Sequence, residues 1–149
     1  MADIFISYST VDASAAQFIH RNLVEQGVSA FLAAASLQPG QQWSPEILEA
    51  LRGSDCVLFL ASRSACASPW VQQELGYAIG AKKKLIPIIW DMKPTDLPGW
   101  VSGYQALDLA RHSPEEVKQE VAAIAARIKT NKQTALLVAG LAIAALFLK

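Results

Sequence analysis

Cys56-Val57-Leu58-Phe59-Leu60 is an uninterrupted apolar run near the middle of the 149-residue chain, and it decides the fold class. A short run of this kind is typical of a strand that is covered on both faces, as in a parallel sheet. Four further runs, rich in Val, Ile, Leu and aromatic residues, have the same character: 4–7, 28–32, 85–89 and 104–107. The sequence therefore predicts five parallel strands.

Helix starts lie between these runs and share one pattern. Ser44-Pro45, Ser68-Pro69 and Ser113-Pro114 each place a hydroxyl N-cap before a proline, whose missing N–H costs nothing at the first helical position. A further helix is expected from near Asp12 to before Gly27. Strand and helix thus alternate, and parallel neighbouring strands need right-handed crossovers that place helices on both faces. The predicted class is α/β of the doubly wound kind.

The C-terminal residues 134–148 read TALLVAGLAIAALFL and contain no charge. As a helix they would span about 22 Å, which is less than the roughly 30 Å of a bilayer core. Two interpretations stay open. The segment is a membrane anchor that holds a domain of residues 1–130 on the cytoplasmic side of the inner membrane, or it packs in an oligomer of a cytoplasmic protein through its small residues. A helix that is apolar on every face offers no solvated side, which favours the anchor. The predicted organisation is a domain at 1–130 and a hydrophobic helix at 131–149.

Charge and cysteine content exclude several classes of function. Lys and Arg together number 13, as do Asp and Glu, so no basic field attracts nucleic acid and we expect no nucleic-acid partner. Cys56 and Cys66 give neither a disulfide framework nor a metal-ligand spacing. His20 and His112 have no second ligand at metal spacing, so no metal site is predicted.

The loops after the first three strands carry the candidate site, because doubly wound sheets bind ligands outside the carboxyl ends of their strands. Ser7 and Tyr8 follow the first strand, and the loop after the third strand leads into the helix that carries Trp70 and Glu74. A helical wheel puts Trp70, Glu74 and Tyr77 along one flank, at the edge of the buried stripe. A carboxylate there is partly desolvated yet reaches a ligand. On residue type alone, a solvated Glu on a helix flank is the commoner case.

Five separated segments change that balance: DIFISYS at 3–9, LQPGQQW at 37–43, SDCVL at 54–58, SPWVQQE at 68–74 and KLIPI at 84–88. In this order they resemble the Toll/interleukin-1 receptor (TIR) domain of bacterial type, over roughly residues 1–130. The Trp-x-x-x-Glu element at 70–74 is the specific part. The resemblance implies a flavodoxin-like sheet of five parallel strands. It also implies an enzyme, because the enzymatic members of the family cleave the nicotinamide glycosidic bond of NAD+ with the Glu of this element.

By this resemblance Glu74 is the catalytic residue and Trp70 lines the site beside it. The remaining substrate contacts are assigned to Tyr77, Ser7, Tyr8, Ser36, Leu37 and Gly40. One carboxylate is enough because nicotinamide leaves a cationic pyridinium as a neutral base, so no general acid is needed, unlike in most glycosidases. The anion stabilises positive charge as it moves onto the ribose. NAD+ is then the substrate, and no cofactor is expected.

The expected partners are NAD+, further copies of the chain through TIR–TIR contacts that activate the enzyme, and a membrane through residues 134–148. A role in antiviral defence signalling follows from the bacterial type, and the product is left open between ADP-ribose, a cyclic isomer and a conjugate. The alternative function is a TIR–TIR signalling adaptor without catalysis. A nucleoside deoxyribosyltransferase shares only the fold type and the acid. A phosphoryl-accepting receiver is disfavoured, because the third strand runs into Ala61-Ser62 without an Asp.

Overall fold

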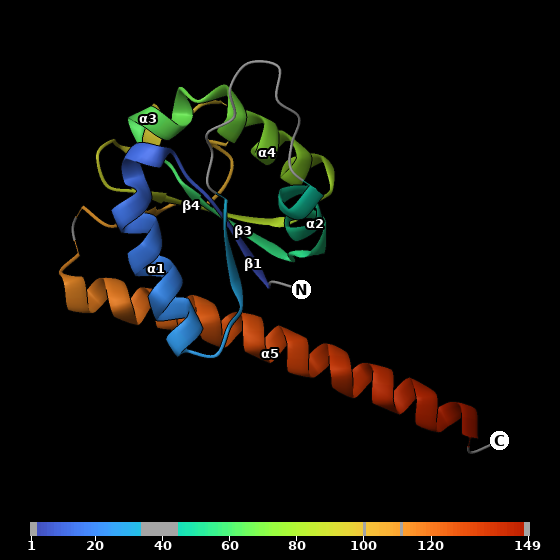
Figure 1. The fold of residues 1–149 in the computed structure, drawn as a ribbon. Helices are drawn as coiled ribbons and strands as arrows, with labels where there is room; N and C mark the ends of the chain where they lie inside the picture. Colours follow the sequence, from blue (N-terminus) through green and yellow to red (C-terminus); the bar gives the residue numbers. More distant parts are fainter. Residues whose placement is uncertain (1–2, 34–44, 100, 111, 148–149) are drawn as a thin grey trace.

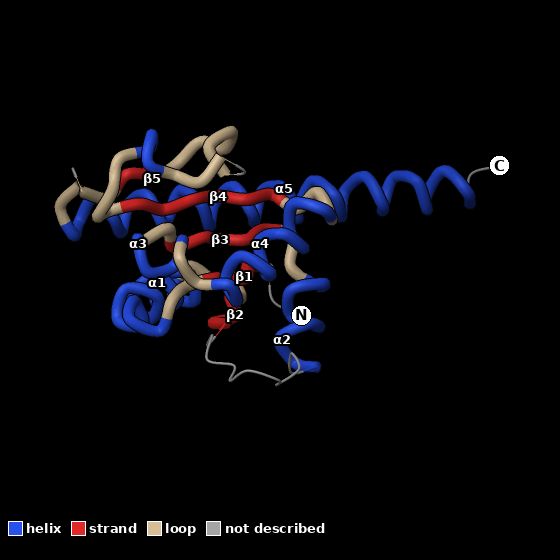
Figure 2. The backbone as a smooth tube through the Cα atoms, turned by 90° about the horizontal axis from the view of Figure 1, so that it is seen from above, coloured by secondary structure: helices blue, strands red, loops and turns tan. Residues whose placement is uncertain are grey.

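The sheet has five parallel strands, as predicted. The computed structural model describes residues 3–33, 45–99, 101–110 and 112–147, and for residues 131–147 it describes the backbone. The strands are β1 (Ile4–Ser7), β2 (Ala30–Ala33), β3 (Cys56–Leu60), β4 (Lys84–Ile89) and β5 (Leu107–Asp108). Their order is β2-β1-β3-β4-β5, every neighbouring pair is parallel, and Figure 2 shows them side by side. This is the flavodoxin-like order.

Helices cover both faces of the sheet (Figure 1). One face packs against α1 (Ala13–Glu25) and α5 (Pro114–Phe147), and the other against α2 (Pro45–Gly53), α3 (Arg63–Cys66) and α4 (Pro69–Gly80). The three predicted Ser-Pro starts all open helices, at Pro45, Pro69 and Pro114. The short α3 and the two 3-10 turns, η1 (Thr10–Asp12) and η2 (Pro94–Asp96), were not predicted. Each has only three or four residues, too few to show a helical period.

The core explains why the central strands are apolar throughout. Every residue of β1 and β3 is buried. Ile4 and Ile6 belong to the cluster under α1 and α5, whereas Phe5 belongs to the cluster under α2, α3 and α4. Successive side chains of a strand point to opposite faces, so a strand between two helical layers must be apolar at every position. Ser7, the last residue of β1, is the exception, and it lies at the candidate site.

The C-terminal helix includes the residues of the predicted domain boundary. α5 runs without a break from Pro114 to Phe147, across the predicted boundary between residues 130 and 131. Figure 1 shows its second half extending beyond the sheet. Within the described part of the chain, no helix combines the length and the apolar character needed to cross a membrane. The side chains of the predicted anchor at 134–148 lie outside that part. The anchor and the domain boundary thus stay predictions.

Candidate active site

The order of the strands reverses between β1 and β3, and this reversal places the candidate site. β2 lies on one side of β1, whereas β3, β4 and β5 lie on the other. The connections that leave the carboxyl ends of β1 and β3 therefore diverge and leave room for a ligand. Ser7 ends β1, and β3 leads through Ser62 into α3 and α4. These segments bring the residues of the β1 loop next to α4.

α4 positions the acid of the Trp-x-x-x-Glu element. Ser68 has an extended backbone conformation, and its hydroxyl accepts a hydrogen bond from the Val71 N–H at 3.4 Å, which caps the helix before its first-turn proline. The buried residues of α4 are Val71, Glu74, Leu75 and Ala78. Their spacing of three and four residues defines the helix face that packs on the sheet. Glu74 is therefore part of the buried face itself, and its predicted position at the edge of that face is wrong.

The Glu74 carboxyl group is fully buried, with an exposed fraction of 0%. Its Oε1 accepts a hydrogen bond from the Ser7 hydroxyl at 3.2 Å, whereas Oε2 has no hydrogen-bond partner among the described residues. Burial raises the pKa of Glu74 from 4.5 to about 8, and the Ser7 hydrogen bond acts in the opposite direction. The group is thus held mainly neutral near pH 7, and its Oε2 is buried without a hydrogen-bond partner among the described residues.

One aromatic residue, Tyr8, lies close to this carboxyl group, and two others share α4 with it. Tyr8 is buried, and both burial and the nearby Glu74 charge raise the pKa of its phenol. Trp70, one turn before Glu74 on α4, is half-buried. Tyr77 differs from both, because 38% of it is exposed. The structure therefore brings Ser7, Tyr8 and Glu74 together, with Trp70 one turn away, and places Tyr77 toward solvent.

The loop after β2 was assigned three further contacts. Ser36, Leu37 and Gly40 all lie outside the described residues. Their assignment stays a prediction.

Two side-chain hydrogen bonds at the same edge of the sheet, each involving a serine hydroxyl, were not predicted. The Ser62 hydroxyl donates to the Asp12 carboxylate and accepts from the Ala65 N–H at 3.0 Å, so it caps α3 and ties the end of β3 to η1. The Ser9 and Ser64 hydroxyls are hydrogen-bonded at 3.1 Å. A Ser directly after an apolar strand is a recognisable helix N-cap, and that signal was available. These bonds hold the β1 loop against α3, beside the Glu74 site.

Comparison with known proteins identifies the family. A family model described as a TIR domain matches residues 4–134. The chain belongs to the TIR domain family. A Brachypodium distachyon protein named "Probable 2' cyclic ADP-D-ribose synthase BdTIR" is 31% identical over 97 residues, which cover 64% of this chain. The chain spans 43% of the length of that relative.

Solved TIR structures share the fold. The TIR domain of the Toll-related receptor TRR-2 from Hydra magnipapillata has a TM-score of 0.68 and 18% identity, covering 87% of this chain and 99% of that one. The TIR domains of the activated Roq1 resistosome have a TM-score of 0.67 and 17% identity, covering 81% and 97%. A TIR-STING receptor from C. gigas has a TM-score of 0.63 and 20% identity, covering 84% and 40%. The predicted TIR fold is confirmed, whereas the bacterial type stays a prediction.

Proposed function

We propose that this TIR domain cleaves the nicotinamide–ribose bond of NAD+, as a glycohydrolase or an ADP-ribosyl cyclase, with Glu74 contacting the ribose. The observation that carries the proposal is the Glu74 carboxyl group, which is buried at the carboxyl edge of the sheet with Oε2 unpartnered among the described residues. Desolvation of an acid beside a ligand crevice is common at functional sites. The name of the Brachypodium relative, a cyclic ADP-D-ribose synthase, supports the same chemistry.

The reaction needs a negative charge at the ribose and no acid at the leaving group. When the C–N glycosidic bond breaks, its electron pair goes to the pyridinium nitrogen, and nicotinamide leaves as a neutral molecule. Positive charge then develops on the ribose, where an ionised Glu74 stabilises it in a site with little water. Water adds at the same carbon and loses a proton in hydrolysis, whereas a hydroxyl of the same substrate adds in cyclisation.

The neighbours of Glu74 control its charge and the shape of the site. The Ser7 hydroxyl favours the carboxylate over the neutral acid, because a hydrogen bond to the ionised form stabilises it. Ribose hydroxyls that donate to Oε2, together with the positive charge of the pyridinium, act in the same direction. Tyr8 supplies a flat surface close to the acid, and Trp70 lies one helical turn before it on α4. Substrate binding therefore produces the charge that the reaction uses.

Self-association is the second part of the proposal. The similar Roq1 TIR domains come from a resistosome, which supports activation of this chain by TIR–TIR contacts. A C-terminal anchor at residues 134–148, on the cytoplasmic side of the inner membrane, would concentrate the domains on a surface and raise their effective concentration. Antiviral defence signalling is the role proposed for such an assembly. A cytoplasmic oligomer is the alternative location.

The test measures nicotinamide released from NAD+ by the purified chain, free and bound to liposomes, over a range of protein concentrations. The test variant is Glu74→Gln, which keeps the shape of the side chain and removes its charge. Glu49→Gln is the matched control, because Glu49 is an exposed acid on α2. We expect release from the wild type and the control but not from Glu74→Gln. Equal release from all three chains would remove Glu74 from the mechanism. No release from any of them, even at high density, would favour the adaptor.

A further inference from the structure

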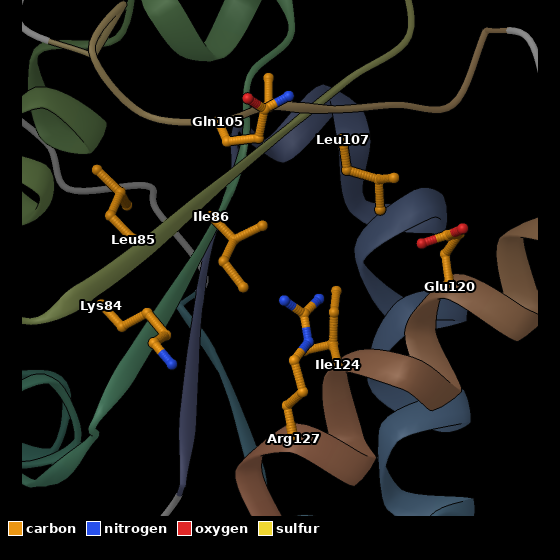
Figure 3. A pocket seen from close by; sticks show the side chains of 9 residues that line it. Lys84, Leu85, Ile86, Gln105, Leu107, Glu120, Ile124 and Arg127 are labelled. Atoms are coloured by element: carbon orange, nitrogen blue, oxygen red, sulfur yellow. The ribbon is translucent and has the colours of Figure 1, made fainter.

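A cavity of about 400 Å³ lies between β4, β5 and α5 (Figure 3). Its volume is in the range of small-molecule sites. Ile86, Leu107 and Ile124 of its lining pack with the α1/α5 core cluster, whereas Leu85 and Ala106 pack with the opposite cluster. The described lining includes none of the residues assigned to the proposed NAD+ site, so the two sites are separate.

The cavity exists because β5 is too short to cover β4. Only Ile88 and Ile89 of β4 pair with β5, so residues 84–87 pair with β3 alone among the described strands. The Lys84 N–H and the Ile88 carbonyl bond toward β3, so Pro87, which alternates with them, faces the uncovered side. Proline is tolerated there because no strand requires its N–H. α5 consequently faces this part of β4 across a space that no described strand fills.

Charged side chains divide the lining of the cavity into two ends. Lys84 and Arg127 provide positive charge at one end, and Glu120 provides a carboxylate at the other (Figure 3). On α5, Ile124 lies between Glu120 and Arg127. Glu120 and Arg127 are seven residues apart on one face of the helix, which corresponds to a rise of about 10 Å. Lys84 and Arg127 both counteract the effect of burial on the pKa of the Cys56 thiol, so both cations act on the same region.

We propose that this cavity binds a small organic anion with an apolar body and a hydrogen-bond donor at its far end. The anion lies between Lys84 and Arg127, the apolar body contacts Ile86 and Ile124, and the donor reaches Glu120. A simple fatty carboxylate lacks the donor and leaves Glu120 without a complementary group. A cationic amphiphile meets two like charges at the positive end. The ligand class therefore follows from the order of charges along the cavity.

The test uses three probes that share one apolar chain: 8-aminooctanoate, octanoate and octylamine. Binding to the full chain is measured by NMR, from the methyl signals of Ile86, Leu107 and Ile124. We expect 8-aminooctanoate to bind most tightly and octylamine most weakly, with shifts confined to these methyl groups. The extended amino acid separates its charged ends by about 10 Å, similar to the rise along α5 between Glu120 and Arg127.

Variants of exposed Arg127 and half-buried Glu120 test the two ends. Arg127→Gln should weaken octanoate and 8-aminooctanoate by about two- to fivefold, as expected for one solvent-accessible charge pair. Glu120→Gln should weaken 8-aminooctanoate, whose ammonium group reaches Glu120, and leave octanoate unchanged. Lys118→Gln is the matched control, because Lys118 is an exposed cation of α5 outside the cavity. The proposal would be overturned by equal affinity for all three probes or by no binding. It would also be overturned if sedimentation showed that the NMR shifts arise only from a change in oligomeric state.

Discussion

The burial of Glu74 makes a quantitative prediction about stability and pH. The folded chain holds the pKa of this carboxyl group at about 8 instead of 4.5, because burial disfavours its charged form. Between these pH values the folded chain keeps a proton that the unfolded chain has released. The free energy of unfolding therefore falls as pH rises through this window, and the loss is complete above the folded pKa.

The size of the effect follows from the same shift. One pH unit corresponds to about 1.4 kcal/mol, so the rise in the pKa to about 8 amounts to an upper limit of about 5 kcal/mol lost above pH 8. No reduction for surface screening applies to a side chain with 0% exposure, although local opening that lets water reach the carboxylate reduces the value. Glu74→Gln keeps a neutral group at this position at every pH. The variant should therefore match the wild type near pH 5 and exceed its stability by several kcal/mol at pH 9.

Urea unfolding followed by tryptophan fluorescence at pH 5, 7 and 9 measures this difference. Glu49→Gln, on the exposed side of α2, should differ from the wild type by the same small amount at every pH. A Glu74→Gln difference that does not grow with pH, or a wild type more stable than the variant at pH 9, would show that the carboxyl group is not desolvated as the structure indicates. Such a stability gain with loss of activity is expected where an acid is buried for function.

The other predictions concern the charge of Glu74 and the turn after α4. If ionised Glu74 is the active form, kcat/KM for NAD+ should rise with pH through about 8, and Ser7→Ala should move this profile about one pH unit higher by removing a hydrogen bond to the carboxylate. Ser54→Ala, which removes a buried hydroxyl elsewhere, should leave the profile in place. Lys82 has a φ of 56°, so Lys82→Gly should stabilise the chain by about 1 kcal/mol in urea unfolding. Lys83 donates to carbonyl oxygens at the end of α2, at 2.9 and 2.6 Å, so Lys83→Met should cost about 1 kcal/mol in the same assay.

Local patterns were enough for the strands and the helix starts. Cys56–Leu60 is a strand with the predicted bounds, because a strand buried on both faces must be apolar throughout. The Ser-Pro pairs predicted helices because hydroxyl capping and a proline at the first position act within one turn of the chain. The fifth strand was predicted at 104–107 and lies at Leu107–Asp108. An edge strand has one partner, so its bounds depend on pairing with β4 more than on its own residues.

The residues of the candidate site stay a prediction, and the structure shows a geometry that differs from the predicted one. The Trp-x-x-x-Glu element and the loop after the first strand pointed to Glu74, Ser7 and Tyr8, and the structure brings these three together. The helical wheel grouped Glu74 with Tyr77, whereas the structure buries the first and exposes the second. A wheel gives the angles between side chains on one helix, but the rotation of that helix on the sheet is set by packing against the strands.

The amino-acid sequence is sufficient for the α/β class and the TIR family and for proposing Glu74 as the acid, because alternation of elements, helix caps and a short motif are local properties of the chain. The desolvation of Glu74, its bond to Ser7 from a strand 67 residues away and the cavity beside β4 come from the folded state. Each of these depends on which distant segments exclude water from one another, and that exclusion exists only once the sheet and its two helical layers have packed.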